Sequence, residues 1–374
     1  MFNYPKIAFW IIKNRTLNYL KDINVDRLLY VFRVNHGLDT QQADPNGGWD
    51  APDFPFRSHV QGHFLSAWAQ CYVVLGDQTC YDRATYFVAE LTKCQANNKA
   101  SGFTDGYLSG FPESDFAKLE NATLSNGNVP YYATHKTLAG LLDTWRLVND
   151  TTSRDVLLSM AQWVDDRTAS LSYDELQEIL QTEFGGMNEV LADIYHQTGD
   201  DKWLTVAKRF DHTAVFNPLA ADEDELDGLH ATTQVPKWIG AVRQYKAQGD
   251  SRYLDIARNA WKIMSTRTRM RSVVTVKLNI FTPQTPLPHI LRVTLVKHLT
   301  RELWLVDPEN SAYFDFYENA LLNHLLGQQD PDSEHGHITY FTPLNGRRGV
   351  GPAWSGGTWS TDYDSFWCCQ ATVD

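Results

Sequence analysis

Apolar residues recur at intervals of three and four along most of the chain, and this spacing predicts amphipathic helices. Near the N-terminus the pattern is carried by Leu17, Leu20, Ile23, Leu28, Leu29 and Phe32. We therefore expect residues 1–40 to be helical. A polar, glycine-rich loop follows from Gly37 to Arg57. A long loop of this kind inside a compact domain is often functional.

The strongest pattern is an internal repeat, in which one helix ends at a turn carrying Asp and a second helix begins a few residues later. The turns are Gly76-Asp77, Asn149-Asp150, Gly199-Asp200, Gly249-Asp250 and Val306-Asp307. In such a turn Gly closes one helix in the left-handed conformation and Asp caps the next. Repeated helix pairs predict either an α/α toroid or an open helical array. We favour the toroid, because the loops between units are long and aromatic, as expected for loops that crowd one mouth.

The C-terminal part of the chain departs from the helical pattern. Ile338 to Thr342 has the composition of a strand, and a loop rich in Gly, Trp and Ser leads from it to Cys368 and Cys369. The sequence therefore predicts a mainly α protein with a short β segment near the C-terminus. We assign residues 1–335 to the helical domain and residues 336–374 to the start of a β region that carries the cysteine pair.

A second departure lies inside the helical domain. From Ile256 to Arg301 there is no Asp or Glu, but there are nine Lys and Arg, although the surrounding chain is acidic. Within this window Val273 to Ile280 has strand composition, and Pro283, Pro286 and Pro288 exclude a helix. Local composition that contradicts the global pattern requires an explanation.

The charge of the whole chain limits its partners. The formal net charge of −12 argues against nucleic acid as a ligand. No stretch is long and apolar enough to cross a membrane, and the apolar run from Ile7 to Ile12 is too short for a signal-peptide core. Aromatic residues make up 13% of the chain, which favours a ring-lined surface of the kind that stacks on sugars. Asn14, Asn121 and Asn149 begin glycosylation sequons that are usable if the protein is exported.

The five cysteines fall into two groups. Cys71, Cys80 and Cys94 could supply one disulfide, but we expect them to be buried as small hydrophobic residues. Cys368 and Cys369 are adjacent, a geometry that rarely permits a mutual disulfide. They can instead both face one soft metal ion, or one can act as a nucleophile while its neighbour holds a metal.

Several histidines are candidates for a site. His59 and His63 are spaced to share one helical face, a spacing that can bind a metal, although contact with sugar hydroxyls or helix capping is the more common role. His135 and His230 lie where loops enter the helices of later repeats. Each of these residues alone is usually structural. Together they occupy the positions from which a toroid builds its pocket.

The carboxylate candidates are Asp53, Glu183 and Glu189, which we would test first if hydrolysis used two carboxylates. Glu183 stands before a Gly pair at a predicted helix start. From there it either points into a cavity or caps the following helix, and the sequence leaves both roles open.

A set of short motifs is more specific than any single candidate. It comprises Gly47-Gly48-Trp49-Asp50-Ala51-Pro52, His59-Val60-Gln61-Gly62-His63, Thr182-Glu183-Phe184-Gly185-Gly186-Met187-Asn188, Gly228-Leu229-His230-Ala231, Thr233-Gln234-Val235-Pro236-Lys237 and Phe366-Trp367-Cys368-Cys369. Together these motifs resemble the β-L-arabinofuranosidase-type glycoside hydrolases, family 127 and its relatives. The resemblance runs from about residue 14 to 265 and again from 299 to the end.

The resemblance implies an (α/α)6 barrel that removes terminal β-L-arabinofuranose from plant-derived glycans with retention. Its partner would be an arabinose-containing oligosaccharide or glycan, and its location would be extracellular. The implied nucleophile is Cys368, held as a thiolate by a zinc ion bound to Cys368 and Cys369, because zinc lowers a thiol pKa. The implied sugar contacts are His63, His135 and His230, to which we add Glu183, Trp49 and Asp50.

The chain also departs from the pattern of this family. The family completes its zinc site with Glu-x-Cys before the motif found here as Leu299-Thr300-Arg301-Glu302-Leu303, and it places its acid/base Glu slightly upstream. Both are missing here, and both losses fall in the acid-free window. We therefore expect residues 268–298 to derive from a wrong reading frame or a misplaced splice junction, which sequencing of the transcript would test. The β region also looks truncated, since the family continues into β-sandwich domains.

We therefore expect a glycoside hydrolase catalytic domain with weak turnover or none, and weak zinc binding, because no general acid is found. General acid assistance is typically worth about 10²–10⁴-fold. Two alternatives remain: a carboxylate-dependent α/α-toroid glycosidase or lyase, and a non-catalytic glycan-binding protein.

Overall fold

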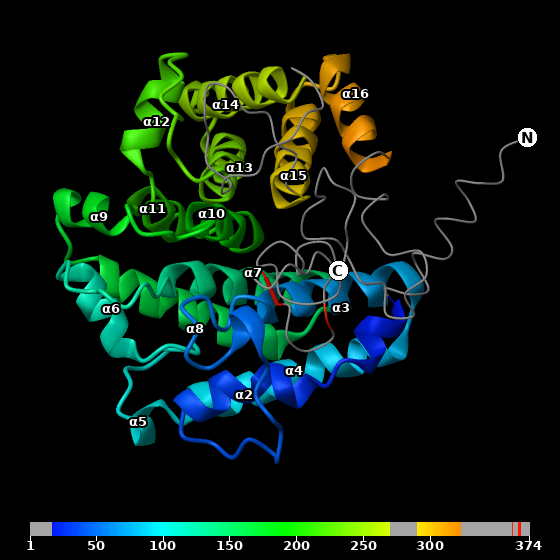
Figure 1. The fold of residues 1–374 in the computed structure, drawn as a ribbon, viewed down its shortest axis with the longest axis vertical. Coiled ribbons are helices and arrows are strands. Elements are labelled where there is room, and N and C mark those ends of the chain that lie inside the picture. The colour runs from blue at the N-terminus through cyan, green and yellow to red at the C-terminus, as the bar shows by residue number, and fades with distance from the viewer. Residues whose placement is uncertain (1–16, 270–289, 323–360, 362–365, 368–374) are drawn as a thin grey trace, which may run out of the picture.

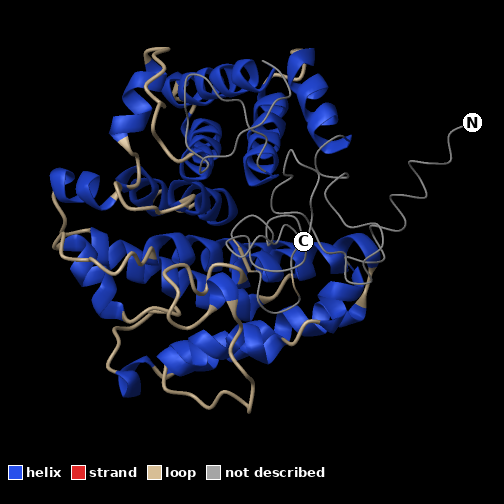
Figure 2. Cartoon of the chain, in the orientation of Figure 1, coloured by secondary structure: helices blue, strands red, loops and turns tan. Residues whose placement is uncertain are grey.

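The computed structural model describes residues 17–269, 290–322, 361 and 366–367 of the chain. These residues are mainly helical, with no strand among them (Figures 1 and 2). The helices are α2 (Val25–Asn35), η1 (Gly48–Asp50), α3 (Gln61–Leu75), α4 (Gln78–Ala96), α5 (Asn98–Ser101), α6 (Glu113–Glu120), α7 (Pro130–Val148), α8 (Thr151–Thr168), α9 (Tyr173–Ile179), α10 (Met187–Thr198), α11 (Lys202–Arg209), α12 (Thr213–Ala220), α13 (Ala231–Gln248), α14 (Ser251–Arg269), α15 (Ile290–Val306) and α16 (Ser311–Ala320).

The repeat predicted from the sequence is confirmed as a series of helical hairpins. The pairs α3–α4, α7–α8, α10–α11, α13–α14 and α15–α16 each pack together. Gly76, Asn149, Gly199 and Gly249 close the first helices in the left-handed conformation. The Asp that follows each of them accepts a hydrogen bond from an amide at the start of the second helix. The fifth turn differs, because Asn310 rather than Asp307 caps α16.

The first helices of the hairpins form the inner layer. We call them the inner helices: they are α3, α7, α10, α13 and α15, which pack on one another in that order. The second helices pack on them, and α4 and α8 also contact each other. Closure of this series into a six-hairpin barrel remains a prediction.

Two close crossings fix the inner helices against one another. A Cβ on Gly62 of α3 would collide with the backbone carbonyl of Lys136 on α7, and a Cβ on Gly140 of α7 would lie 2.8 Å from Leu65 Cβ. At the next crossing Gly240 of α13 makes room for Asn188 of α10. The Asn188 side chain then donates to the carbonyl of Lys237, at 3.0 Å. These three glycines are therefore needed for helix packing.

Some sequence predictions need correction or lie outside the described residues. The helix expected over residues 1–40 is interrupted: residues 17–22 are helical, and Asn24 then caps α2 by accepting from Asp26 and Arg27 amides. The β segment at Ile338 to Thr342 and the strand at Val273 to Ile280 lie outside the described residues, so the domain division is untested. The end of the acid-free window is helical, as the start of α15.

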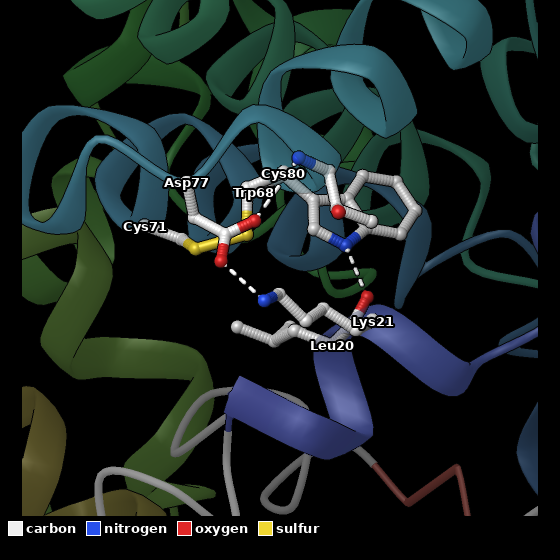
Figure 3. Close-up of a disulfide and its surroundings, with 7 residues drawn as sticks. Leu20, Lys21, Trp68, Cys71, Asp77 and Cys80 are labelled. Atoms are coloured by element: carbon white, nitrogen blue, oxygen red, sulfur yellow. Dashed lines mark hydrogen bonds and ion pairs between the residues drawn. A yellow bond between two sulfur atoms is a disulfide. The ribbon is translucent and has the colours of Figure 1, made fainter.

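The expectation that Cys71 and Cys80 are buried free thiols is wrong. They form a disulfide that joins α3 to α4 (Figure 3). Cys94 stays free and buried. Beside the disulfide, Trp68 Nε1 donates to the Leu20 carbonyl at 2.9 Å, and Lys21 pairs with Asp77. This part of the chain is therefore fixed by covalent, polar and packing contacts together.

In the described part of the chain, no helix combines the length and the apolar character needed to span a bilayer.

Candidate functional site

The predicted site residues of successive repeats meet at one end of the inner helices. We call this the N-terminal end; it consists of the first turns of α3, α7, α10 and α13 and the loops before them. His63 is the third residue of α3, Glu189 is the third residue of α10, and His230 is the N-cap of α13. His135 lies in the second turn of α7. These positions converge because the inner helices run in the same direction.

His63 has a ring nitrogen available for a ligand. Its Nε2 is buried and has no hydrogen-bond partner among the described residues. Burial holds the pKa of His63 well below its usual value, and the positive charge of Lys136 lowers it further. The ring is therefore neutral at physiological pH, so it can donate from one nitrogen and accept at the other.

The prediction that His59 and His63 share one helical face is wrong. His59 precedes the helix, because α3 begins at Gln61. Its Nδ1 donates to the Phe56 carbonyl at 2.6 Å, and burial lowers its pKa to about 3. The ring stacks on Tyr132 and lies 6.3 Å from the Trp49 ring. His59 is thus a neutral member of an aromatic wall.

Trp49 belongs to the same wall. Its ring stacks on Phe56 and Phe54, with centroids 5.1 and 5.6 Å apart. Its neighbour Asp50 is buried, with 1% of its surface exposed. The Asp50 carboxylate accepts hydrogen bonds from Asn46, Gln61 and the Ser58 amide. These contacts show Asp50 holding the loop onto α3, and its predicted contact with sugar is untested.

His135 lies directly beneath the Gly185-Gly186 turn. A Cβ on Gly185, where φ is +61°, would lie 2.5 Å from His135 Nδ1. A Cβ on Gly186 would lie 2.9 Å from His135 Nε2 and 2.8 Å from Glu189 Oε2. The glycine pair therefore allows His135 and Glu189 to approach the same point. Burial holds the pKa of His135 well below its usual value, so this ring is also neutral.

Glu183 does not cap α10, because the N-cap is Gly186 and no side chain bonds there. Its Oε2 lies 3.8 Å from His230 Nδ1. The His230 ring also contacts the hydroxyl groups of Thr233 and Thr232, at 2.7 and 2.9 Å. Asp53, the other carboxylate candidate, is exposed in the loop before α3.

Sequence reasoning missed a buried lysine beside this pair. Lys237 Nζ donates to His212 Nδ1 at 2.9 Å and to Gln234 Oε1 at 3.0 Å, and it lies 4.5 Å from the centre of the Phe184 ring. Burial lowers the pKa of Lys237 to about 7, and the negative charge of Glu183 opposes that shift. His212 belongs to no motif, so the sequence carried no signal for its contact with Lys237.

The approach of the chain to the cysteine pair is visible at two residues. Phe366 packs edge-to-face on Phe64 of α3, with ring centroids 6.4 Å apart, and its backbone lies near His59. Trp367 is fully buried. The predicted nucleophile and zinc ligand, Cys368 and Cys369, lie outside the described residues. Within the described part, no three His, Cys, Asp or Glu residues are grouped so that they could hold a metal ion.

Comparisons with known proteins give the family. The chain matches the family model "Beta-L-arabinofuranosidase, GH127 catalytic domain" over residues 6–373. No curated protein sequence matches it.

Solved structures have a similar fold at low sequence identity. A GH127 β-L-arabinofuranosidase from Geobacillus stearothermophilus T6 is 15% identical, with a TM-score of 0.66 over 97% of this chain and 61% of its own. Another GH127 β-arabinofuranosidase is 15% identical, with a TM-score of 0.64 over 96% of this chain and 58% of its own. The unsaturated glucuronyl hydrolase from Bacillus sp. GL1 is 13% identical, with a TM-score of 0.53 over 94% of this chain and 96% of its own.

The chain thus spans about three fifths of the length of those two arabinofuranosidases. The family model, in contrast, covers almost the whole chain. This chain belongs to the GH127 β-L-arabinofuranosidase catalytic-domain family.

Proposed function

We propose that the chain is a retaining glycoside hydrolase that removes terminal β-L-arabinofuranose from plant-type glycans, with Cys368 as its nucleophile. The observation that carries this proposal is the packing of Phe366 on Phe64, the neighbour of His63. Phe366 belongs to the same motif as Cys368, and its backbone lies near His59. This contact supports a nucleophile that the motif brings to the N-terminal end.

Binding of the sugar would use the neutral rings of the N-terminal end. His63 and His135 each keep a buried nitrogen with no partner among the described residues. A sugar hydroxyl both donates and accepts, so it can satisfy such nitrogens, and unpaired buried polar atoms are otherwise costly. The aromatic wall around Trp49 supplies ring faces on which a furanose can stack.

Activation of a thiol would draw on the helix starts. The first turn of α3 carries unpaired amides and the positive end of its dipole, and both favour a thiolate. The buried Lys136 adds positive charge close to His63.

Zinc remains a prediction from the family resemblance. Two thiolates are too few for a zinc site, and the described residues contain no group of three ligands that could complete one. We therefore derive no step through a metal.

A carboxylate-dependent toroid hydrolase is the second candidate, and the proximity of Glu183 to His230 favours it. A glycan-binding protein without catalysis is the third. It would use the same histidines and aromatic rings and would need no nucleophile.

Turnover of 4-nitrophenyl β-L-arabinofuranoside by the full chain distinguishes the three candidate functions. We expect Cys368→Ala to abolish release of nitrophenol and Glu183→Gln to weaken release without abolishing it. Loss of activity in Glu183→Gln alone would instead identify the carboxylate enzyme. Calorimetric binding of arabinose without hydrolysis, unaffected by a chelator, would identify the binding protein. The zinc content of the purified protein, measured by mass spectrometry, tests the predicted metal.

We also propose an extracellular location. The Cys71–Cys80 disulfide supports it, since disulfides persist mainly in oxidising compartments. The sequon residue Asn121 is exposed at the end of α6, where a glycan would fit. Thiol labelling of protein collected from the culture medium tests this. Before reduction we expect no label on Cys71 or Cys80; retention in the cell with both thiols free would contradict the proposal.

A further inference from the structure

Glu189 occupies a central place at the N-terminal end. It is the third residue of α10, and its Oε2 lies near the point where a Cβ on Gly186 would stand. His135 Nε2 lies 2.9 Å from the same point, so the two side-chain atoms are within twice that distance of each other. A sugar bound at His135 would therefore lie within reach of the Glu189 carboxyl.

The Glu189 carboxyl has no partner in the described part of the chain, where it makes no hydrogen bond or ion pair. A glutamate at the third helical position often bonds back to the N-cap amide. Among the described residues no such bond joins the Gly186 amide to Glu189, although Gly186 is the N-cap of α10. Two other carboxylates of the inner helices do have a partner: Asp193 and Glu302 both form ion pairs with Arg243. Within the described part of the inner helices, Glu189 is thus a carboxyl left available for a ligand.

The surroundings keep Glu189 protonated near neutral pH. Burial is the main cause, and it raises the pKa of Glu189 to about 8. Asp193 on the same helix and Glu302 on α15 also raise it, while Arg243 on α13 and Lys136 on α7 lower it. His135, which faces Glu189 from α7, is neutral and adds no charge. A carboxyl of this kind is protonated when a leaving group needs a proton and can take one back later.

We propose that Glu189 is the general acid and base of this chain. When the anomeric carbon bonds to the nucleophile, the bond to the leaving oxygen breaks, and its electron pair takes the Glu189 proton. In the second half, the Glu189 carboxylate takes a proton from water as the water oxygen bonds to the anomeric carbon and the nucleophile leaves. The inference rests on the proposed function and supplies the acid that the sequence lacks.

The dependence of kcat/KM on the leaving group tests this role, because a good leaving group needs no proton. The substrates are 2,4-dinitrophenyl and methyl β-L-arabinofuranoside, and the variant is Glu189→Gln. We expect kcat/KM to fall about 10²–10⁴-fold for the methyl glycoside and less than about tenfold for the dinitrophenyl glycoside. Glu309→Gln makes the same change at an exposed carboxylate before α16 and should leave both values unchanged.

Two further readouts separate catalysis from a structural role. The wild type should lose kcat/KM for the methyl glycoside as pH rises through about 8, and Glu189→Gln should not show this loss. Azide should restore turnover of the dinitrophenyl glycoside by Glu189→Ala, because a small anion replaces the missing carboxylate.

The outcomes separate this inference from the proposed function. An active wild type with equal losses on both substrates, or no loss on either, overturns the role of Glu189 alone. A folded wild type that hydrolyses neither substrate overturns the proposed function, and this inference falls with it.

Discussion

At the C-terminal end of the inner helices charged residues pair with one another, whereas at the N-terminal end several polar atoms have no partner among the described residues. The C-terminal end carries a ladder of ion pairs across four inner helices. Arg146 of α7 lies 3.7 Å from Asp193 of α10, which lies 3.1 Å from Arg243 of α13. Arg243 then meets Glu302 of α15 at 2.9 Å. At the opposite end, His63 Nε2 and His135 Nδ1 are buried and have no partner in the part of the chain that the structure describes.

The difference separates stability from function. A polar group that is buried with its partner costs little, whereas one buried without a partner loses its hydration and gains nothing in return. Such groups persist where a ligand supplies the missing bonds, so they tend to gather at functional sites. We infer that the ladder holds the inner helices together and that the N-terminal end is kept available for substrate.

The largest expected effect comes from breaking the ladder. Glu302→Ala leaves Arg243 and Lys246 without their shared carboxylate, whose side chain is only 3% exposed. We expect a loss of about 3–5 kcal/mol in the free energy of unfolding, measured with urea. Arg154→Ala removes an exposed pair with Asp155 and should cost less than about 1 kcal/mol. Equal costs in the two variants would contradict the ladder's role.

A second variant tests the crossing that fixes the N-terminal end. In Gly62→Ala the new Cβ collides with a backbone carbonyl of α7, which cannot move aside. We expect a loss of about 1–3 kcal/mol or more in unfolding free energy, with KM raised as His63 shifts. Gly76→Ala is the matched control: its φ is +66° but nothing lies within 4 Å, so only about 1 kcal/mol of backbone strain should appear. A smaller cost at Gly62 than at Gly76 would refute the close crossing.

Acidification should test the buried histidines. Burial lowers the pKa of His36 to about 4, from about 6.5 in the unfolded chain. Between these values the unfolded state binds the proton and the folded state does not, so this residue destabilises the fold as pH falls below 6.5. His36→Phe should gain up to about 1.4 kcal/mol relative to wild type for each pH unit between about 6.5 and 4. A difference in urea unfolding that does not change with pH would contradict this.

The smallest expected change in stability belongs to the N-terminal end itself. His135→Phe removes a nitrogen that has no partner among the described residues and keeps most of the ring volume. We expect the unfolding free energy to change by less than about 1.5 kcal/mol, measured with urea. A cost as large as that of Glu302→Ala would show that His135 is a structural residue.

The hairpins could be predicted because their signals are local. A Gly or Asn followed by Asp marks a helix end and the next cap within a few residues, as at Gly76 and Asn149. Placing His63, His135 and His230 near the starts of inner helices followed from the same repeat. Gly62 could be recognised as part of a motif. Its role in packing, however, depends on the neighbouring helix α7.

The remaining features depend on contacts between distant parts of the chain. The Cys71–Cys80 disulfide forms because α4 folds back on α3, which no spacing rule shows. His212 and Lys237 are far apart in the sequence and bond only in the folded chain. The contacts of Asp50 with Asn46 and Gln61 likewise depend on how the loop folds against α3. Glu189 is a candidate from the sequence, but its nearness to His135 depends on the fold of the Gly185-Gly186 turn.

The most direct test of the difference between the ion-pair ladder and the N-terminal end is kcat/KM for 4-nitrophenyl β-L-arabinofuranoside. It is measured for variants of both ends at a temperature where all are folded. We predict that His135→Phe lowers kcat/KM by about 10–100-fold, the equivalent of about 1.4–2.7 kcal/mol. Arg146→Ala, at the far end, should keep it within about twofold of wild type. Full activity in His135→Phe, or equal losses in both variants, would contradict the assignment of the N-terminal end as the active site.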